Sequence, residues 1–318
     1  WPPTSKYLTA ASASPDGERV AVTARGEVFN VPAAKGVTKN ITRTPGAHER
    51  DAQWSPDGKF IAYISDATGE TELYLQDAVE GNPVQLTKNN DTYIRTFDWS
   101  PDSKKIVYTD RKNRINLLDV ASHRVTVLPQ DPMGEPDDVT FSPDNNWLTY
   151  TRDADNEITV VYVYDIAGKK EYAVTDKWYN SSSPVFSTDG KYLIFSSARD
   201  FNPTYGSLEW NHVYTKMYGV YLALLSKDTP SPFLQKDAVV STDAEAEASK
   251  ATTGKAAADK KDAKAETASA LVKFDADGIT DRIIRLPLSA SYYANFYSDG
   301  KKIYYGDYGS GNTRVYDL

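Results

Sequence analysis

Short runs of apolar residues alternate with polar turns along the whole chain. Six of these runs follow a turn signal that reads Ser-Pro-Asp-Gly or a close variant. The runs are residues 20–22, 60–63, 106–108, 147–150, 192–195 and 303–305. A short apolar run bounded by turn residues is typical of a buried β-strand. The pattern therefore predicts an all-β fold.

The turn signal indicates a hairpin in each unit. Serine, then proline with its fixed φ, then aspartate and glycine is the residue order of a type I turn. The turn aspartates are expected to bond their own backbone rather than a metal; they are Asp16, Asp57, Asp102, Asp144, Asp189 and Asp299. An aromatic residue stands before five of the turns, at Trp54, Trp99, Phe141, Phe186 and Tyr297. The tryptophans and phenylalanines at this position are expected to lie in the core between units.

The spacing of the turns predicts a β-propeller. Their first serines are 41, 45, 42 and 45 residues apart, and the last interval is 111. Third and fourth apolar runs, such as 72–75 and 84–87, complete each unit, and four strands in about 40–45 residues is the signature of a propeller blade. Strand-by-strand alignment of the long interval leaves one blade with two insertions. We therefore predict a single propeller over residues 1–318, with about six TolB-like or WD-like blade units starting near residues 8, 49, 94, 136, 181 and 291.

The two insertions differ in composition. Residues 198–219 include Phe201, Tyr205, Trp210, His212 and Tyr214, a density that predicts an ordered loop packed on the propeller or against a partner. Residues 227–275 contain a low-complexity stretch at 236–270, rich in Ala, Lys, Asp and Glu and without aromatic residues. Such a stretch buries too little apolar surface to offset its ordering entropy, so it is expected to be disordered or transiently helical.

Charge and cysteine content narrow the function classes. The net charge of −8 argues against nucleic-acid binding, which requires a basic surface to meet phosphates. The chain has no Cys, which excludes disulfides, thiolate nucleophiles and Cys-ligated zinc. No apolar run approaches the roughly 20 residues that cross a bilayer, so no membrane contact is expected.

Candidate chemistry is sparse. His48, His123 and His212 are the three histidines, and none lies in a His-Glu-x-x-His or Gly-x-Ser-x-Gly context. We therefore predict no catalytic, cofactor-binding or metal-binding residues in the chain. The loop with His48, Glu49 and Arg50, and Trp210 with His212 in the aromatic insertion, are the candidates for contact with a substrate in a pore. A solvated polar loop and a packed aromatic loop are the alternatives for these two segments.

Several strings go beyond generic propeller repeats. Residues 24–31 read Ala-Arg-Gly-Glu-Val-Phe-Asn-Val, residues 197–203 read Ser-Ala-Arg-Asp-Phe-Asn-Pro, and residues 277–283 read Asp-Gly-Ile-Thr-Asp-Arg-Ile. They resemble the second propeller of tricorn-type serine peptidases, and matches of this kind span essentially the whole chain. The Ser-Pro-Asp-Gly units alone are shared by many propellers.

The resemblance implies a seven-bladed, non-catalytic propeller that acts as a channel or filter for peptides. It implies a serine peptidase region outside this chain, with peptides and the other parent domains as partners. The last unit stops in its third strand, so an open ring with exposed strand edges is expected, and a homo-oligomer is possible. The resemblance points to the periplasm for a bacterial protein and to the cytoplasm for an archaeal one. The alternatives are a TolB-type interaction propeller and the propeller of a prolyl-oligopeptidase-like hydrolase.

Overall fold

The chain folds almost entirely into β-strands, arranged as successive antiparallel sheets. The computed structural model describes residues 7–78, 81–129, 133–201, 203–206, 211–234 and 270–318. Within these residues, five sheets have four strands each and a sixth has three. Each sheet pairs its strands in the order of the chain. This confirms the predicted all-β fold with four-stranded antiparallel blades.

The strand bounds follow the repeat. The first three blades contain β1 (Leu8–Ala13), β2 (Arg19–Ala24), β3 (Glu27–Pro32), β4 (Lys39–Asn40), β5 (Glu49–Trp54), β6 (Phe60–Ser65), β7 (Glu72–Asp77), β8 (Val84–Gln85), β9 (Ile94–Trp99), β10 (Lys105–Asp110), β11 (Ile115–Asp119) and β12 (Arg124–Val127). The other three contain β13 (Asp137–Phe141), β14 (Trp147–Asp153), β15 (Thr159–Asp165), β16 (Lys170–Ala173), β17 (Ser181–Phe186), β18 (Tyr192–Ser197), β21 (Gly219–Leu224), β22 (Ile283–Arg285), β23 (Tyr293–Ser298), β24 (Lys302–Asp307) and β25 (Asn312–Asp317). A separate hairpin contains β19 (Pro203–Tyr205) and β20 (His212–Tyr214), and a 3-10 helix, η2 (Ile279–Arg282), precedes β22.

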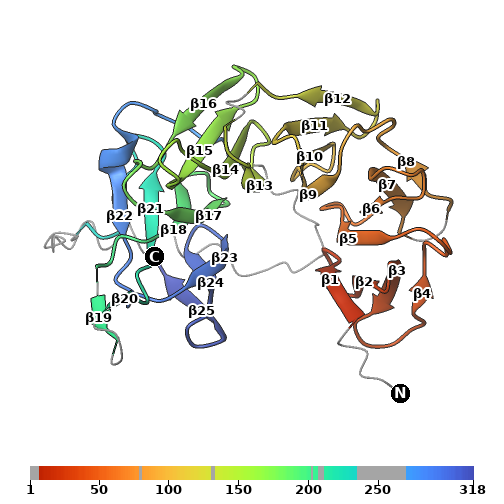
Figure 1. Cartoon of the computed structure of the whole chain (residues 1–318), viewed down its shortest axis with the longest axis horizontal. Coiled ribbons are helices and arrows are strands. Elements are labelled where there is room, and N and C mark those ends of the chain that lie inside the picture. Colours follow the sequence, from red (N-terminus) through yellow and green to blue (C-terminus); the bar gives the residue numbers. More distant parts are fainter. Residues whose placement is uncertain (1–6, 79–80, 130–132, 202, 207–210, 235–269) are drawn as a thin grey trace, which may run out of the picture.

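The sheets stand side by side around an arc. Figure 1 shows the first strand of each sheet, β1, β5, β9, β13, β17 and β23, on the inner side of the arc, with the fourth strands on the outer side. The arc is open between the first and sixth sheets (Figure 1). We call the six first strands the inner wall. The end of the blades with the Ser-Pro-Asp-Gly turns is the turn end, and the opposite end is the loop end.

The turn end repeats one hydrogen-bond pattern in five blades. The first serine of each turn donates from Oγ to the turn aspartate at 2.5–2.7 Å. The same Oγ accepts the backbone N–H five residues later at 2.8–3.0 Å. These serines are buried, and they are Ser14, Ser55, Ser100, Ser142 and Ser187. The aspartate of each of these turns accepts the backbone N–H two residues later at 3.1–3.3 Å, which is the backbone-bonding role that the sequence predicts.

The aromatic residue before each turn packs between neighbouring blades in four cases. Trp54, Trp99, Phe141 and Phe186 are each at most 8 % exposed and lie in apolar clusters shared by two sheets. Tyr297 differs, because it is 55 % exposed and Phe296 is buried instead. The reason is the turn of the last blade, which reads Ser-Asp-Gly and is one residue shorter. Its serine, Ser298, therefore belongs to the strand and pairs with Ile303. A shift of one residue turns the neighbouring side chains to the opposite face of a strand.

The long interval contributes one four-stranded sheet. Phe195 pairs with Tyr221 across β18 and β21, and their rings stack at 6.0 Å. The C-terminal end of the second insertion packs on the blades, because Val272 is buried and the ring of Phe274 lies 5.2 Å from that of Trp147. Defined contacts therefore extend into the 227–275 segment from its end. Residues 235–269, and with them nearly all of the predicted low-complexity stretch, lie outside the described residues.

Candidate functional site: the inner wall and its loop end

The inner wall has a β-bulge near the loop end of every blade. Four of the bulges contain a non-glycine residue with a left-handed backbone, with φ between 52° and 55°; these are Asp51, Asp138, Ser183 and Asn295. Short polar residues tolerate this conformation better than branched ones because their side chains can bond locally. Bulges often lie next to functional sites, where they redirect side chains. The sequence signal for this position is the recurring Asp, Ser or Asn, which lies outside the turn motif of the repeat.

A cavity of about 380 Å³ opens on the inner wall of the first three blades. Its lining comes from β1, β5 and β9, and consists of Ala10, Ala11, Ser12, Asp51, Ala52, Gln53, Thr96 and Phe97. Small and polar side chains dominate this lining. Such a surface offers hydrogen-bonding groups without a deep apolar pocket, which suits an extended polar chain better than a compact apolar ligand.

Side chains of the inner wall close the seams between blades. Ser12 accepts a hydrogen bond from the N–H of Trp54 at 3.1 Å, and the side-chain amide of Gln53 donates to the carbonyl of Phe97 at 2.8 Å. Ser12 and Gln53 hold equivalent places in successive blades, two residues before the serine of the turn. The bonds satisfy backbone groups that an edge strand would otherwise leave open to pairing. At these two seams the wall is thus a fixed surface rather than a row of free strand edges.

Asp98 of the third blade holds the place that Ser12 and Gln53 hold in the first two blades. Burial raises the pKa of Asp98 to about 7, although backbone N–H groups of Trp99 and Phe141 bond its carboxylate and oppose the rise. The carboxyl group therefore changes its charge near neutral pH. Since Phe141 belongs to the next blade, this titration takes place at an interblade seam.

His48 lies at the loop end, where the chain enters β5. Its side chain is exposed, and its backbone N–H donates to a carboxylate oxygen of Asp66 at 2.7 Å. The loop passes close to the preceding blade, because a Cβ placed on Gly26 would meet the imidazole ring at 3.1 Å. Gly26 has a φ of 77°, so a glycine is needed at this position both for its left-handed backbone conformation and for the close approach of His48.

Glu49 does not reach the surface. It is 1 % exposed, and its carboxylate accepts a hydrogen bond from the hydroxyl of Ser65 at 2.9 Å. Its backbone N–H donates to the carbonyl of Gly26 at 2.9 Å. Its side chain therefore supports the blade from within, and a peptide in this structure would not contact it directly.

Arg50 links the second blade to the third. Its guanidinium donates to the carbonyl of Arg95 at 3.0 Å and to that of Ile94, and it pairs with the carboxylate of Asp51. The guanidinium carbon also lies 4.3 Å from the ring centre of Tyr93, which makes a cation–π contact. Arg50 is thus partly buried at the mouth of the inner wall, with much of its donor capacity used. Its partners in the third blade lie more than 40 residues away along the chain, which is why the sequence pattern did not indicate them.

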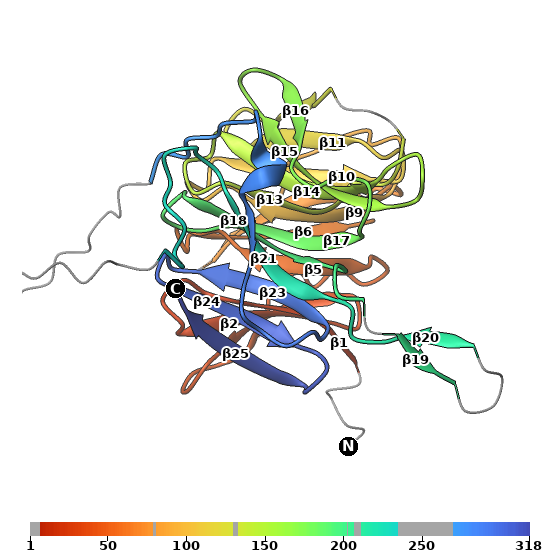
Figure 2. The ribbon, with the colours of Figure 1, turned by 90° about the vertical axis from the view of Figure 1, so that its left-hand side faces the viewer.

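The aromatic insertion projects from the loop end. Figure 2 shows β19 and β20 as a hairpin that extends beyond the body of the propeller. Phe201 is 74 % exposed and its ring lies 5.7 Å from that of Tyr214. His212 is in β20, and Trp210 lies outside the described residues. Phe201, Tyr205 and Tyr214 are thus open to solvent rather than packed on the blades.

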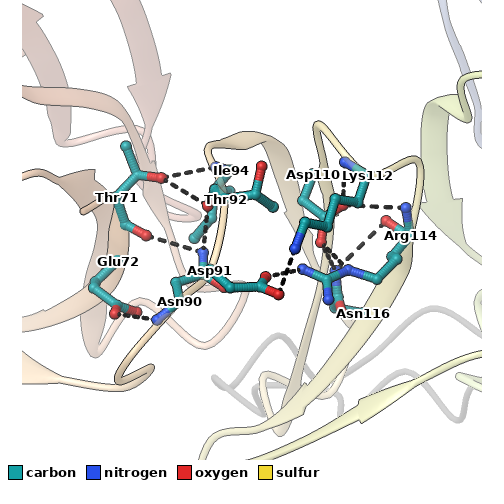
Figure 3. A network of polar contacts seen from close by, with 10 residues as sticks. All are labelled: Thr71, Glu72, Asn90, Asp91, Thr92, Ile94, Asp110, Lys112, Arg114 and Asn116. Atoms are coloured by element: carbon teal, nitrogen blue, oxygen red, sulfur yellow. Dashed lines mark hydrogen bonds and ion pairs between the residues drawn. The ribbon is translucent and has the colours of Figure 1, made fainter.

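A polar network fixes the loop between β8 and β9 (Figure 3). Glu72 accepts the N–H of Asn90 at 2.8 Å, and the side-chain amide of Asn90 donates to the carbonyls of Thr71 and Thr92 at 3.0 and 3.1 Å. The next residue of the loop, Asp91, forms ion pairs with two cations of the third blade, as Figure 3 also shows. The loop that positions Tyr93 is therefore braced by both neighbouring blades.

Metal and membrane features are absent from the part of the chain that the structure describes. No group of three His, Asp or Glu side chains there could hold a metal ion. In the same residues no helix is long and apolar enough to cross a bilayer.

Comparison with known proteins places this geometry in a family. The family model for the second β-propeller domain of tricorn protease matches residues 8–315. "Tricorn protease homolog 1" of Streptomyces coelicolor is 25 % identical over 232 residues, which cover 70 % of this chain and 22 % of that protein. This chain thus spans under a quarter of the relative's length.

Solved structures agree with the family match. The crystal structure of tricorn protease superposes with a TM-score of 0.76 at 15 % identity, over 98 % of this chain and 30 % of that one. The structure of a TolB from Agrobacterium tumefaciens, described as putative, gives a TM-score of 0.50 at 24 % identity, over 68 % of this chain and 76 % of that one. The TolB likeness concerns the fold alone. The family match over residues 8–315 means that this chain belongs to the second β-propeller domains of tricorn proteases.

Proposed function

We propose that this propeller is a peptide channel or filter of a tricorn-like serine protease, whose catalytic residues lie outside this chain. The observation that carries the proposal is the cavity of about 380 Å³ on the inner wall. It is lined by small and polar residues on three neighbouring first strands. An extended peptide has a polar backbone, and such a surface can hold it loosely enough to let it pass.

Two of the sequence-based candidate residues remain suited to this role. His48 is exposed at the loop end, and Arg50 lies beside the mouth of the inner wall. Glu49 supports them from inside the blade. Asp51, Gln53 and Thr96 join the candidates because they line the cavity.

An interaction adaptor of TolB type is the second candidate function. The observation in its favour is the exposed aromatic surface of the β19–β20 hairpin, which could dock on another protein. A prolyl-oligopeptidase-like parent would instead have a Gly-x-Ser-x-Gly nucleophile turn in its catalytic region. In both cases the inner wall need not contact a moving peptide.

The test is to block the inner wall in a parent protease that carries this chain. The chain contains no Cys, so Thr96→Cys gives it a single attachment point for a bulky maleimide polymer. Thr126→Cys on the outer strand β12 is the matched control, since Thr126 is also exposed. Thr96 lines the cavity, whereas Thr126 does not.

Labelled Thr96→Cys enzyme should cleave a peptide of about 20 residues, roughly 70 Å when extended, more slowly than unlabelled enzyme. Cleavage of a dipeptide substrate should change much less, because a small molecule is less obstructed. Labelled Thr126→Cys enzyme should cleave both at the unlabelled rate. Equal rates for the long peptide in both labelled enzymes would contradict the proposal.

A further inference from the structure

Two positions at the loop end recur in the first three blades. One is the residue before the inner strand, and the other is the residue after the second strand of the same blade. The pairs are Tyr7 with Arg25, His48 with Asp66, and Tyr93 with Arg111. In the third blade the two positions are tied by a backbone hydrogen bond of 3.0 Å from Arg111 to the carbonyl of Tyr93. In the second blade the backbone N–H of His48 bonds the carboxylate of Asp66, so the fold brings the two positions together there too.

In the first and third blades the pair is an arginine over a tyrosine ring. The guanidinium carbon of Arg25 lies 4.4 Å from the ring centre of Tyr7, and that of Arg111 lies 4.6 Å from the ring centre of Tyr93. Both tyrosines are 37 % exposed, and both arginines are exposed. Contact with a ring orients a guanidinium and leaves its N–H donors available.

Other arginines near this mouth have acidic partners. Arg95 pairs with Glu135, and Arg114 pairs with both Asp91 and Asp110. Across the described residues, neither Arg25 nor Arg111 has a carboxylate within ion-pair distance. Their charges are thus not neutralised by a neighbouring side chain, in a protein whose net charge is negative.

The two Arg–Tyr pairs stand at the ends of the strands that line the cavity. Tyr7 directly precedes β1 and Tyr93 directly precedes β9, and both strands contribute to the cavity wall. Figure 1 shows β5 between them on the inner side of the arc. The loop that carries Tyr93 is braced by the network of Figure 3. Both pairs therefore lie beside a path from the loop end to the cavity.

We propose that the loop end of the first three blades binds peptide carboxylates through the guanidinium groups of Arg25 and Arg111. A guanidinium binds a carboxylate with two parallel hydrogen bonds, and the ring of Tyr7, which Arg25 alone contacts as a cation among the described residues, offers apolar surface to the adjoining part of the peptide. The carboxylate belongs to an acidic side chain or to the C-terminus. This inference rests on the proposed channel function, and it defines peptides rich in carboxylates as the preferred class at the mouth.

Fluorescence anisotropy on the 318-residue chain tests the proposal at low ionic strength, where screening is weakest. The probes are labelled peptides of one length: one with several Glu and an amidated C-terminus, one with Gln at those positions, and one Gln peptide with a free C-terminus. The variant is Arg25→Gln with Arg111→Gln. The control is Arg124→Gln with Lys301→Gln, which removes the same charge from exposed residues at the turn end. Circular dichroism verifies that each variant is folded.

The Glu peptide should bind more tightly than the amidated Gln peptide. The Arg25 and Arg111 double variant should weaken binding of the Glu peptide about five- to thirtyfold, as expected for the loss of two partly exposed ion pairs. The turn-end control should have a much smaller effect. Tighter binding of the Gln peptide with a free C-terminus than of its amidated form would assign the C-terminus as a further source of the carboxylate.

Equal affinities for the Glu and amidated Gln peptides would overturn the proposal. So would equal losses in the two double variants, because that would reflect overall charge alone. Neither result bears on the channel itself, which the Thr96→Cys blockade tests independently. Conversely, a Glu preference that survives a failed blockade would make the loop end a carboxylate-binding surface outside any channel.

Discussion

At the turn end, five serine side chains make the same two hydrogen bonds in five successive blades. At the loop end, the residue pair changes from blade to blade. The first and third blades have an arginine over a tyrosine ring, and the second blade has a histidine beside an aspartate. The same strands connect the two ends. The difference therefore comes from the connecting segments and not from the sheets.

The turn end and the loop end differ in what their side chains do: the first stabilises the blades, and the second offers groups for binding. At the turn end, the five serines bond within their own blade, and Ser103 and Asn145 accept backbone N–H groups from the turn of the preceding blade, so these side chains are already engaged without a ligand. Loop-end side chains include exposed rings and guanidinium groups without acidic partners. Residues in connecting loops are where proteins usually place binding groups on a rigid scaffold. Substitutions at the turn end should thus change stability, and substitutions at the loop end should change binding.

The largest effect is expected when a buried tryptophan near the turn end is compared with an exposed one at the loop end. Trp99 is 5 % exposed between two blades, whereas Trp178 is 80 % exposed. Trp99→Ala should lower the free energy of unfolding by about 3–5 kcal/mol, because it leaves a large cavity. Trp178→Ala should change it by less than about 0.5 kcal/mol. Denaturant unfolding measures both, and similar losses would break the distinction.

A second effect concerns pH at an interblade seam. The pKa of Asp98 is about 7 in the folded chain and near the ordinary value of about 3.9 when unfolded, so the folded state binds more protons between these values. The contribution of Asp98 to stability therefore falls as pH rises from about 4 to about 7. Asp98→Asn keeps an acceptor for Phe141 and removes the titration.

The Asp98→Asn variant should be more stable than the parent chain at pH 8 by roughly 1–3 kcal/mol, and similar to it at low pH. Thermal unfolding from pH 5 to pH 8 measures this difference. A constant difference across that range would show that the carboxyl group does not titrate there.

A smaller loss is expected from the turn serines. Ser100 is fully buried, donates to Asp102 at 2.7 Å and accepts the N–H of Lys105 at 2.8 Å. Ser100→Ala should cost about 1–2 kcal/mol of stability, because two hydrogen bonds are lost at a buried site. Ser122→Ala, which removes an exposed hydroxyl that donates to Asp119, is the control. An equal effect of the two variants on the denaturant midpoint would argue against the special role of the turn serines.

The smallest stability effect is expected at the loop-end arginines. Arg25→Gln with Arg111→Gln should change the free energy of unfolding by less than about 0.5 kcal/mol, since both side chains are exposed and unpaired with acids. A loss of several kcal/mol would make these residues structural and remove the contrast between the two ends. Denaturant unfolding of the double variant decides between these outcomes.

The regular part of the fold was accessible from sequence because its signals are local. Serine and aspartate define each turn, with proline between them in four of the six, and the aromatic residue before the turn predicts the core, as at Trp54 and Trp99. Tyr297 departs from this pattern because the pairing in its hairpin is shifted by one residue. A change of register in one hairpin is visible only when the turns are compared position by position.

The candidate site was less accessible because its contacts join distant residues. Buried Glu49 accepts a hydrogen bond from Ser65, 16 residues later, and Arg50 contacts the ring of Tyr93 in the next blade. The charge of a residue such as Glu49 or Arg50 does not reveal which distant residue it will contact. The recurring Asp, Ser and Asn of the inner strands was the one local signal, since it coincides with the left-handed bulges.

Peptide cross-linking tests the central claim most directly. A long peptide with a photoreactive residue at its middle is bound to a catalytically inactive parent protease that carries this chain, irradiated, and mapped by mass spectrometry. The channel account predicts cross-links on the inner strands, at residues 8–13, 49–54 and 94–99, and at the loop end beside them. Cross-links confined to outer strands such as 124–127, or absent from this propeller altogether, would contradict it.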